Sequence, residues 1–299
     1  MAAPEAGGQA VSAHTVFAPA KINLFLHVTG RRDDGYHLLD SLIAFADIGD
    51  RVTVEPSDAL TLRITGPFSD SLPASDDNLV MRAARALAKE GQAASLTGAT
   101  IVLEKNLPVS SGIGGGSADA AATLKALRSL WSVPLDDAAL AAMGLALGAD
   151  IPVCLQSRTS RMQGIGEKIE PARPLPPVSV VLVNPGVAVS TVGVFSRRSG
   201  GYSDCAEDAG PWADAAAMAD GLRRSGNDLT DAAVSLEPVI GDVLAMLDGV
   251  QGCLLARLSG SGATCFGLFP DDGAATRAAD IIAAAHPGWW VRATGFVNS

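Results

Sequence analysis

The sequence predicts an α+β fold divided into two domains. Segments typical of strands and of helices follow one another in mixed order, without the regular strand–helix alternation of a doubly wound parallel sheet. The length of 299 residues favours two domains, at about 150 residues each. Prolines cluster at residues 169–177, where we expect the boundary. We therefore predict an N-terminal domain over residues 15–172 and a C-terminal domain over residues 173–299.

The first expected element is a strand over residues 15–28, because residues alternate there with period two. One face carries Ile22 and Leu24, whereas the other face carries Lys21 and Asn23. A charged turn is expected at residues 30–35. The other elements expected in this half are strands at 51–55, 60–65 and 100–104 and helices at 79–89, 117–130 and 137–147.

The second half is expected to begin with a buried strand at residues 178–183. A polar, glycine-rich segment follows at residues 199–210. The remaining expected elements are helices at 212–222, 238–247 and 274–285 and a glycine-rich pair of strands within 253–269.

The charge balance argues against a nucleic-acid or membrane partner. Lys and Arg total 22 against 32 Asp and Glu, which gives a net charge of −10 and a pI near 4.8. Such an excess of negative charge repels phosphate backbones and anionic lipids. The uncharged stretch at residues 175–196 contains prolines and glycines, so a strand and a loop fit it better than a membrane helix.

Cysteine and histidine usage indicates no disulfide framework and no structural zinc site. The four cysteines form no C-x-x-C pair, and the four histidines form no H-E-x-x-H motif. We expect reduced, mostly buried thiols in a cytoplasmic protein. Residues 1–14 lack the basic and apolar regions of a signal peptide, so we expect a disordered tail there. These patterns leave the oligomeric state undetermined.

A glycine-rich loop between an expected strand and an expected helix is the sharpest motif of the sequence. Unpaired N–H groups at a helix N-terminus carry partial positive charge, and glycines let phosphate oxygens approach them. The loop lacks the Gly-Lys-Ser/Thr ending of a Walker A loop, and Ser117 replaces the third glycine of a dinucleotide fingerprint. Phosphate binding is favoured over a flexible turn with a capping serine, and we expect Asp119 to complement the helix dipole. The predicted phosphate loop comprises Pro108, Val109, Ser110, Ser111, Gly112, Ile113, Gly114, Gly115, Gly116, Ser117 and Ala118.

Two charged residues invite both a functional and a structural interpretation. Lys21 is the only one of the five lysines inside an apolar strand pattern. Its ammonium either stabilises charge on a transferred phosphoryl group or reaches solvent from an edge strand. Asp150 lies between a helix stop and Pro152, where it either accepts a proton from an attacking hydroxyl or caps a turn. The residues alone leave both pairs of alternatives open.

Several segments together resemble the GHMP kinase superfamily of small-molecule kinases. They are APAKINLFL at residues 18–26, DGYHL at 34–38, PVSSGIGGGSA at 108–118 and LSGSGAT at 258–264. The resemblance extends from about residue 15 to residue 296. It implies a two-domain GHMP kinase fold, with an N-terminal ribosomal-protein-S5-like domain and a C-terminal α/β-plait domain.

The Lys-Ile-Asn and Asp-Gly-Tyr-His motifs together resemble one branch of the superfamily. That branch uses ATP and Mg²⁺ to phosphorylate the 2-hydroxyl of a cytidyl-linked methylerythritol in the non-mevalonate route to isoprenoid precursors. The resemblance implies that Lys21 and Asp150 are catalytic and that the glycine-rich loop holds the ATP phosphates. It leaves the Mg²⁺ ligands unknown, with Ser117 as the one hypothesis. The residues that it implies for binding the small-molecule substrate are Asn23, Tyr36, His37, Thr191, Gly260 and Gly262.

The sequence departs from the family pattern before Thr191, where Val189 and Ser190 replace the commoner Ile-Pro. Two other hypotheses stay open. A GHMP kinase for a sugar, homoserine or a mevalonate derivative would share the loops without the DGYH segment. A non-catalytic nucleotide-binding relative would lose the lysine or the acid, both of which are present here.

Overall fold

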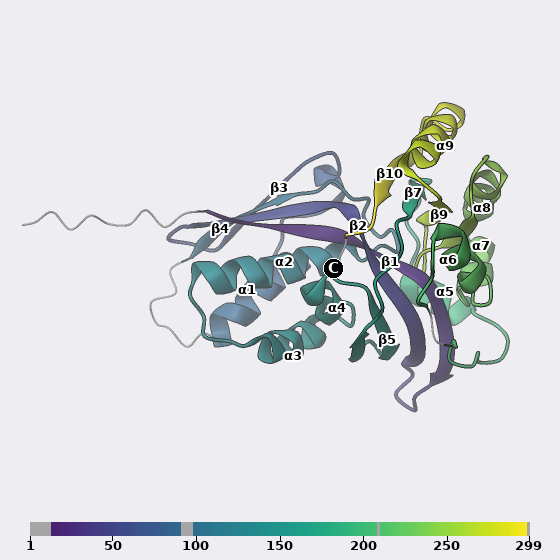
Figure 1. Cartoon of the computed structure of the whole chain (residues 1–299). Helices are drawn as coiled ribbons and strands as arrows, with labels where there is room; N and C mark the ends of the chain where they lie inside the picture. Colours follow the sequence, from purple (N-terminus) through teal and green to yellow (C-terminus); the bar gives the residue numbers. More distant parts are fainter. Residues whose placement is uncertain (1–12, 91–97, 208–209, 298–299) are drawn as a thin grey trace, which may run out of the picture.

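The computed structural model of the chain describes residues 13–90, 98–207 and 210–297 and contains two β-sheets with helices packed on them (Figure 1). The first sheet has six strands, in the order β3-β4-β2-β5-β6 with β1 paired to β2. The second sheet has four strands in the order β10-β7-β9-β8. The predicted α+β class is confirmed, because helices and strands alternate irregularly and most strand pairs are antiparallel.

A long antiparallel hairpin of β1 (His14–Arg31) and β2 (His37–Pro56) runs through the molecule (Figure 1). Register shifts interrupt β1 just before Lys21 and just after Asn23, and both side chains are buried. The first half of β2 was not predicted, because Asp40 and Asp50 break its apolar alternation. Both carboxylates are buried, and each is paired with a cation inside the fold.

Helices of the first half cover one face of the first sheet (Figure 1). The parallel pair β3–β4 lies at one side of this sheet, and β5–β6 at the other. The elements are β3 (Thr61–Thr65), η1 (Ser69–Ser71), α1 (Leu79–Glu90), β4 (Ala99–Glu104), α2 (Gly115–Leu130), α3 (Asp137–Leu147), α4 (Ile151–Gln156), β5 (Ser160–Gly164) and β6 (Lys168–Pro171).

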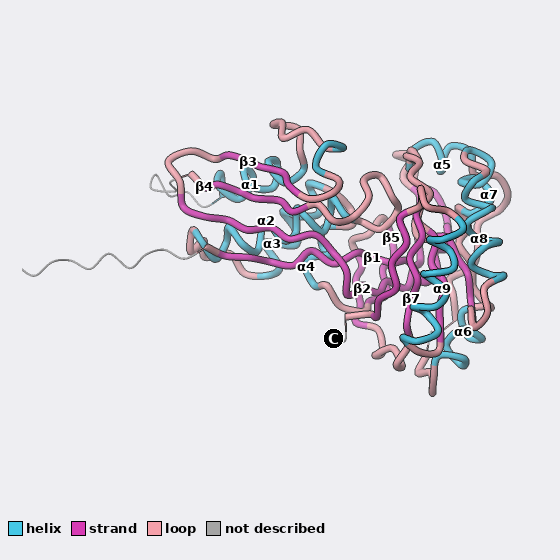
Figure 2. The backbone as a smooth tube through the Cα atoms, turned by 90° about the horizontal axis from the view of Figure 1, so that it is seen from above, coloured by secondary structure: helices cyan, strands magenta, loops and turns pink. Residues whose placement is uncertain are grey.

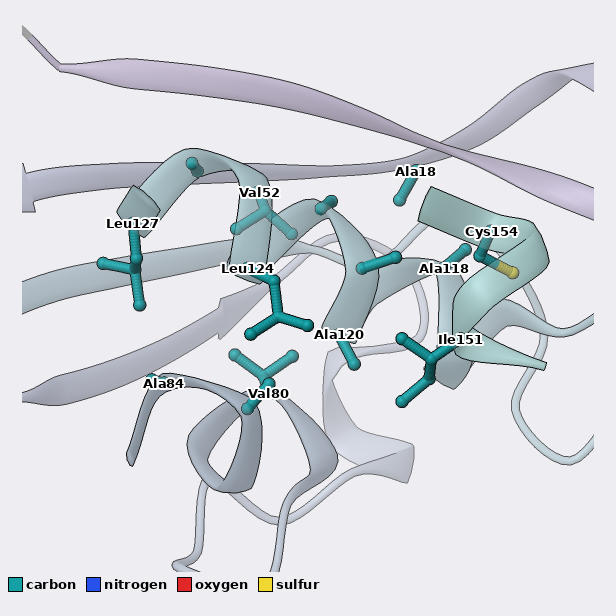
Figure 3. Packing of buried hydrophobic residues seen from close by; sticks show 14 of the residues in the cluster. Ala18, Val52, Val80, Ala84, Ala118, Ala120, Leu124, Leu127, Ile151 and Cys154 are labelled. Atoms are coloured by element: carbon teal, nitrogen blue, oxygen red, sulfur yellow. The ribbon is translucent and has the colours of Figure 1, made fainter. Parts of the chain in front are cut away.

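The helix α2 lies in the middle of the first buried core. Its alanine-rich sequence lets α1, α4 and the sheet approach its backbone closely. Figure 3 shows Leu124 on α2 pointing toward Val80 on α1, with Ile151 of α4 near Ala118 at the start of α2. This packing holds the N-terminus of α2 at a fixed place, directly after the glycine-rich loop.

The second half places its helices along the second sheet, beside the first half (Figure 2). A buried cluster contains Ile22 and Leu24 of β1 together with Leu182 and Phe266 of the second sheet, so the two sheets share a core. The elements are β7 (Ser179–Asn184), α5 (Thr191–Arg197), α6 (Ala215–Leu222), α7 (Thr230–Leu236), α8 (Val239–Gly249), β8 (Leu255–Leu258), β9 (Cys265–Phe269), α9 (Asp272–Ala285) and β10 (Trp290–Gly295).

Several elements differ from the sequence-based expectation. The helix expected from residue 117 begins at Gly115, because Gly114 and not a serine occupies its N-cap. Pro152 lies beyond the end of α3, as expected, but it also stands in the first turn of α4, a short helix that was not predicted and where a missing N–H costs nothing. The short elements β5, β6, α5, α7 and β10 were not predicted, because they carry too few residues to establish a period.

The last described residues return to the first half, since Phe296 bridges to Ala46 and the Val297 N–H donates to the Phe45 carbonyl. The proposed domain boundary near residue 172 lies between β6 and β7 and stays a prediction. Most of the predicted tail, residues 1–12, lies outside the described residues, and His14 already belongs to β1.

Two other expectations concern the cysteines and the membrane. All four cysteines are free thiols, with Cys154 and Cys265 buried, Cys253 partly buried and Cys205 exposed. Within the described part of the chain, no helix combines the length and the apolar character needed to cross a bilayer.

Candidate active site

A cleft of about 1170 Å³ brings together residues from both halves of the chain. Its walls come from β1, the turn between β1 and β2, the glycine-rich loop, the start of α4 and the segment around α5. Of the predicted site residues, Lys21, Asn23, Tyr36, His37, Asp150, Thr191 and Gly260 all line this cleft. Residues more than 200 positions apart in sequence thus meet at one place.

The glycine-rich loop presents the uncapped N-terminus of α2 to the cleft. Gly114 is the N-cap residue and adopts a left-handed conformation with φ of 62°, and no side chain caps the helix. A Cβ on Gly114 would lie 3.0 Å from the Lys21 Cβ, so the loop passes this close only because the residue is glycine. The free N–H groups of the first turn therefore face the cleft as an anion-binding surface.

Most of the predicted phosphate loop borders the cleft, but some residues do not. Ile113 and Ala118 are buried in the cores, where they support the loop. The Ser111 hydroxyl donates to the Pro108 carbonyl at 2.7 Å, so its hydrogen is used inside the loop and only its oxygen can serve a ligand. The loop residues that line the cleft are Pro108, Val109, Ser110, Ser111, Gly112, Gly114, Gly115, Gly116 and Ser117.

The segment between β8 and β9 packs against the phosphate loop. The Thr264 N–H donates to the Ser111 carbonyl at 3.0 Å, and the Ser259 hydroxyl donates to the Gly112 carbonyl at 3.1 Å. A Cβ on Gly260 would lie 2.8 Å from the Gly112 carbonyl oxygen. Gly260 is therefore needed for the close approach of this segment to the loop. Gly260 borders the cleft, whereas Gly262 lies behind the loop against Leu258.

Lys21 and Asp150 form an ion pair in the cleft. The Lys21 Nζ donates to Asp150 Oδ2 at 2.8 Å, and the exposed fractions of the two side chains are 5% and 32%. The Lys21 N–H also donates to the Ile113 carbonyl at 2.8 Å, which ties β1 to the phosphate loop. Lys21 is thus buried rather than solvated, and the Asp150 side chain caps nothing although the residue precedes α4.

Asn23 lies two residues further along β1 and is almost fully buried. Its Nδ2 donates to the Ser41 hydroxyl at 2.8 Å, and its N–H donates to the Ser259 hydroxyl at 3.2 Å. Its Oδ1 accepts no hydrogen bond from any described residue, yet Asn23 lines the cleft. A buried acceptor without a partner is costly, so Oδ1 is ready for a donor from a bound molecule.

A buried cluster of Lys105, Asp50 and Asp119 lies beneath the phosphate loop and was missed by sequence reasoning. The Lys105 Nζ donates to Asp119 Oδ2 at 2.7 Å and also to Asp50 Oδ2, and a Cβ on Gly115 would lie 3.1 Å from this nitrogen. Asp50 also accepts from the Leu107 N–H at 2.8 Å. The cluster therefore fixes the backbone that leads into the loop.

The charges of this cluster follow from burial and pairing. Burial opposes the charged form of Lys105, but Asp119 and Asp50 outweigh it and raise the pKa of the lysine. Burial raises the pKa of Asp119 as well. The expectation that Asp119 complements the helix dipole is wrong, because its carboxyl is turned into this cluster. The signal that could have found Lys105 is its position between a strand and the glycine-rich loop.

The turn between β1 and β2 carries Tyr36 and His37 into the other end of the cleft. Tyr36 is 62% exposed, and the His37 ring stacks on Phe195 of α5 with centroids 4.8 Å apart and planes 23° apart. Burial, followed by the charges of Arg31 and Arg198, lowers the pKa of His37. The imidazole is therefore neutral near pH 7 and offers one donor and one acceptor.

Thr191 is the first residue of α5, and its hydroxyl lies 2.9 Å from the Ser261 hydroxyl. This contact joins α5 to the segment that packs on the phosphate loop. Sequence reasoning missed Phe195 and Arg198, one near the end of α5 and the other just after it, because neither belongs to a recognisable motif. They become neighbours of His37 only through the tertiary fold.

Comparison with known families matches two regions of the chain. Residues 78–158 match the GHMP kinases N terminal domain, and residues 206–288 match the GHMP kinases C terminal domain. Among solved structures, a homoserine kinase from Cytophaga hutchinsonii has a TM-score of 0.69 at 19% identity and covers 94% of each chain. At this identity the likeness concerns the fold alone.

More similar proteins share both the fold and much of the sequence. A 4-diphosphocytidyl-2-C-methyl-D-erythritol kinase from Cereibacter sphaeroides is 56% identical over 92% of this chain and 96% of its own length. One from Paramagnetospirillum magneticum is 49% identical over 94% of this chain and 98% of its own. A crystal structure of a 4-(cytidine 5'-diphospho)-2C-methyl-D-erythritol kinase has a TM-score of 0.78 at 32% identity and covers 96% of this chain and 100% of its own. The chain therefore belongs to the 4-diphosphocytidyl-2-C-methyl-D-erythritol kinase family of the GHMP kinases.

Proposed function

We propose that this protein transfers the γ-phosphoryl group of ATP to the 2-hydroxyl of 4-diphosphocytidyl-2-C-methyl-D-erythritol, in the non-mevalonate route to isoprenoid precursors. Membership of the GHMP kinases implies that the phosphoryl donor is ATP. The observation that carries the proposal is the Lys21–Asp150 ion pair, which lies in the same cleft as the uncapped N-terminus of α2. This arrangement supports phosphoryl transfer to a hydroxyl.

Asp150 is the group suited to take or orient the proton of the acceptor hydroxyl. Its Oδ2 is held by Lys21, while its Oδ1 accepts no hydrogen bond from the residues that the structure describes. With a third of its side chain exposed, the carboxylate is open to the cleft. A positioned base of this kind contributes about 10²- to 10⁴-fold to the rate.

Lys21 has two tasks in this mechanism. It fixes the carboxylate of Asp150, and its ammonium places a positive charge beside the hydroxyl and the phosphoryl group that moves between donor and acceptor. The transition state of phosphoryl transfer is loose and is stabilised mainly by alignment and charge. A lysine held by β1 and buried to 4% exposure keeps its position better than one on a mobile loop.

The donor phosphates are proposed to lie on the N–H groups of the loop that precedes α2. This binding mode suits a protein of net charge −10, because backbone dipoles attract the phosphates locally without a basic surface. The cluster of Lys105, Asp50 and Asp119 supports the loop from below, and the segment around Gly260 supports it from the side.

Magnesium would be held mainly by the substrate phosphates. Among the described residues, no group of three or more His, Cys, Asp or Glu side chains could form a protein cage. Mg²⁺ in kinases takes one or two oxygen ligands from the protein and the rest from phosphates and water. The hydroxyl of Ser117, which lines the cleft at the start of α2, fits this role. When bound, the ion would neutralise charge on the phosphates.

The cytosine is proposed to bind where Tyr36, His37 and Phe195 meet. Two aromatic rings and a neutral imidazole provide stacking surface and a donor–acceptor pair for the base edge. Asn23, with its unpaired Oδ1, and Thr191 line the same cleft from distant parts of the sequence, so they are suited to hold the acceptor.

Phosphate transfer from ATP to 4-diphosphocytidyl-2-C-methyl-D-erythritol tests the proposal, with homoserine, galactose and mevalonate as parallel acceptors. Turnover with the cytidyl substrate alone is the expected result. Turnover with another acceptor instead would refute the substrate assignment and keep the kinase fold. No turnover with any acceptor, with ATP still bound, would favour a non-catalytic nucleotide-binding protein.

A variant pair then tests the cytosine site. His37→Ala should raise the KM of the cytidyl substrate about 10- to 100-fold, the scale of one lost stacking and hydrogen-bonding partner, and leave the KM of ATP unchanged. The control is His286→Ala, because His286 also stacks on an aromatic ring, at 3.7 Å from Trp289, but does not line the cleft. Equal effects of the two substitutions would contradict the assignment.

A further inference from the structure

The charges that line the cleft are unevenly paired. Asp150 is paired with Lys21, and Asp34 is paired with Arg32 at 2.7 Å. Two further cations lie at the His37 end: Arg198, whose only ion pair among the described residues is a long one of 3.8 Å with Asp228, and Arg31, for which no ion pair is seen among those residues. The charged residues that line the cleft are Lys21, Arg31, Asp34, Lys105, Asp150 and Arg198.

Arg198 is a buried guanidinium with an unused donor. Its side chain is 9% exposed, and its Nε finds no hydrogen-bond partner among the described residues. One Nη2 hydrogen goes to the Gly201 carbonyl. The nearest carboxylate oxygen, Asp228 Oδ2, is 3.8 Å from Nη2 and already accepts from the Val28 N–H at 2.7 Å. A buried arginine with an unpaired N–H donor in the wall of a cleft is suited to bind an anion, because the anion would supply the missing acceptor.

Arg31 lines the same end of the cleft from a different element, the end of β1. It is the register partner of His37 across the end of the β1–β2 hairpin. Its Nε donates to the Gly35 carbonyl at 3.1 Å, which leaves its terminal nitrogens free to turn toward the cleft. Arg198 directly follows α5, whose Phe195 stacks on His37. The fold therefore brings both guanidinium groups to the His37 end of the cleft.

We propose that Arg31 and Arg198 bind the diphosphate of the cytidyl acceptor. This inference rests on the proposed function, which places the cytosine at His37 and the reacting hydroxyl at Asp150. The diphosphate joins these two parts of the acceptor and carries its negative charge through the cleft. Guanidinium groups match phosphate oxygens in pairs of parallel hydrogen bonds. In a protein of net charge −10, the two arginines are what makes this end of the cleft attractive to a nucleoside diphosphate.

Calorimetric titration of CDP and of cytidine against the whole protein separates the diphosphate from the base. The wild-type protein should bind CDP more tightly than cytidine. Arg198→Met and Arg31→Met should each weaken CDP binding about 10- to 100-fold and change cytidine binding less than about twofold. Arg198→Lys should restore only part of the CDP affinity, because lysine keeps the charge without the planar fork.

Arg197→Met is the matched control. Arg197 is the neighbour of Arg198, is exposed, and donates from its Nε to the Ser235 hydroxyl at 3.0 Å outside the cleft. Its replacement should leave the ratio of CDP to cytidine affinity unchanged. Melting curves separate a lost subsite from unfolding, and Arg31→Met serves as the second probe because Arg31 lies on the surface.

Turnover measurements complete the test. In both variants the KM of the cytidyl acceptor should rise, while kcat and the KM of ATP stay within about threefold of the wild type. An unchanged ratio of CDP to cytidine affinity in both variants would overturn the inference, and so would a rise in the KM of ATP in place of the acceptor. A wild-type protein that neither binds cytidine nor phosphorylates the cytidyl acceptor would instead overturn the proposed function.

Discussion

Replacing Asp150 by asparagine isolates the charge and basicity of its carboxylate, because the amide has nearly the same shape. The variant keeps an oxygen that can accept from the Lys21 Nζ, which lies 2.8 Å from Oδ2 in the native pair. It loses the negative charge opposite a buried ammonium and the carboxylate that we propose takes the proton of the acceptor hydroxyl. Chemistry and stability are therefore affected to different degrees.

The expected magnitudes follow from exposure and role. Loss of a positioned base lowers kcat at least about 10²-fold. The cost in stability is smaller, about 1–2 kcal/mol, because the Asp150 side chain is 32% exposed and water screens the lost charge, although Lys21 is only 5% exposed. This corresponds to a fall of a few degrees in the melting temperature of a chain of this size. ATP affinity should stay near the wild-type value.

Release of ADP in a coupled assay with the cytidyl acceptor gives kcat, and titration with ATP checks that the variant is folded. The matched control is Asp137→Asn, which removes a carboxylate paired with Arg128 at 2.6 Å but 93% exposed and outside the cleft. It should leave kcat unchanged. A kcat for Asp150→Asn within about threefold of the wild type would refute the assignment of the base.

Three further predictions concern the loop, a buried ion pair and the cytosine site. Gly112→Ala should destabilise the fold by more than about 1 kcal/mol and raise the KM of ATP. The reason is that φ of Gly112 is 75° and the new Cβ would lie 2.5 Å from the Ser259 carbonyl oxygen. An unchanged melting temperature would contradict this prediction. Asp40 is buried. Burial by itself would raise the pKa of its carboxyl, but Arg161 outweighs this effect and holds the pKa in the folded protein below the unfolded value near 3.8. The stability that this ion pair adds is therefore complete above the unfolded pKa and is lost as the pH falls through the folded pKa. Asp40→Asn should cost about 1.5–3 kcal/mol at pH 7 and flatten the acid limb of a plot of melting temperature against pH. Burial and the neighbouring arginines lower the pKa of His37, so the KM of the cytidyl acceptor should stay constant down to pH 6.5 and rise only below it; a rise already at pH 7 would mean that His37 is protonated there.

The sequence predicted only those parts of the site that depend on short local motifs. The glycine-rich loop predicts an anion site from the sequence alone, because tight turns and a helix N-terminus depend on neighbouring residues. The sequence left Lys21 and Asp150 open, because an ion pair between residues so far apart depends on where β1 and α4 meet. The structure resolves the local question: Lys21 is buried and paired, and the Asp150 side chain caps nothing. Their catalytic role stays a prediction.

Lys105 and Asp119 show a different limit of sequence reasoning. An acid early in a helix ordinarily complements the helix dipole, and that local rule was applied to Asp119. The rule failed because α2 begins at Gly115, so Asp119 lies beyond the first turn, and its buried carboxyl pairs with Lys105. Lys105 directly follows β4, and only the tertiary fold shows that its ammonium reaches Asp50 and Asp119.

What the sequence by itself determined was the α+β class, the glycine-rich loop ahead of a helix, the approximate bounds of the long helices and the candidate catalytic residues. These features depend on periodicity, on glycine and on residue type, which act over a few neighbouring positions. Only the tertiary structure decided that β2 continues through buried Asp40 and Asp50, that Phe195 and Arg198 flank His37, and that Lys105 supports the loop from below. The physical reason is that a buried charge or a stacked ring is stabilised by its partner, and the partner can come from a distant part of the chain that only the tertiary fold brings close.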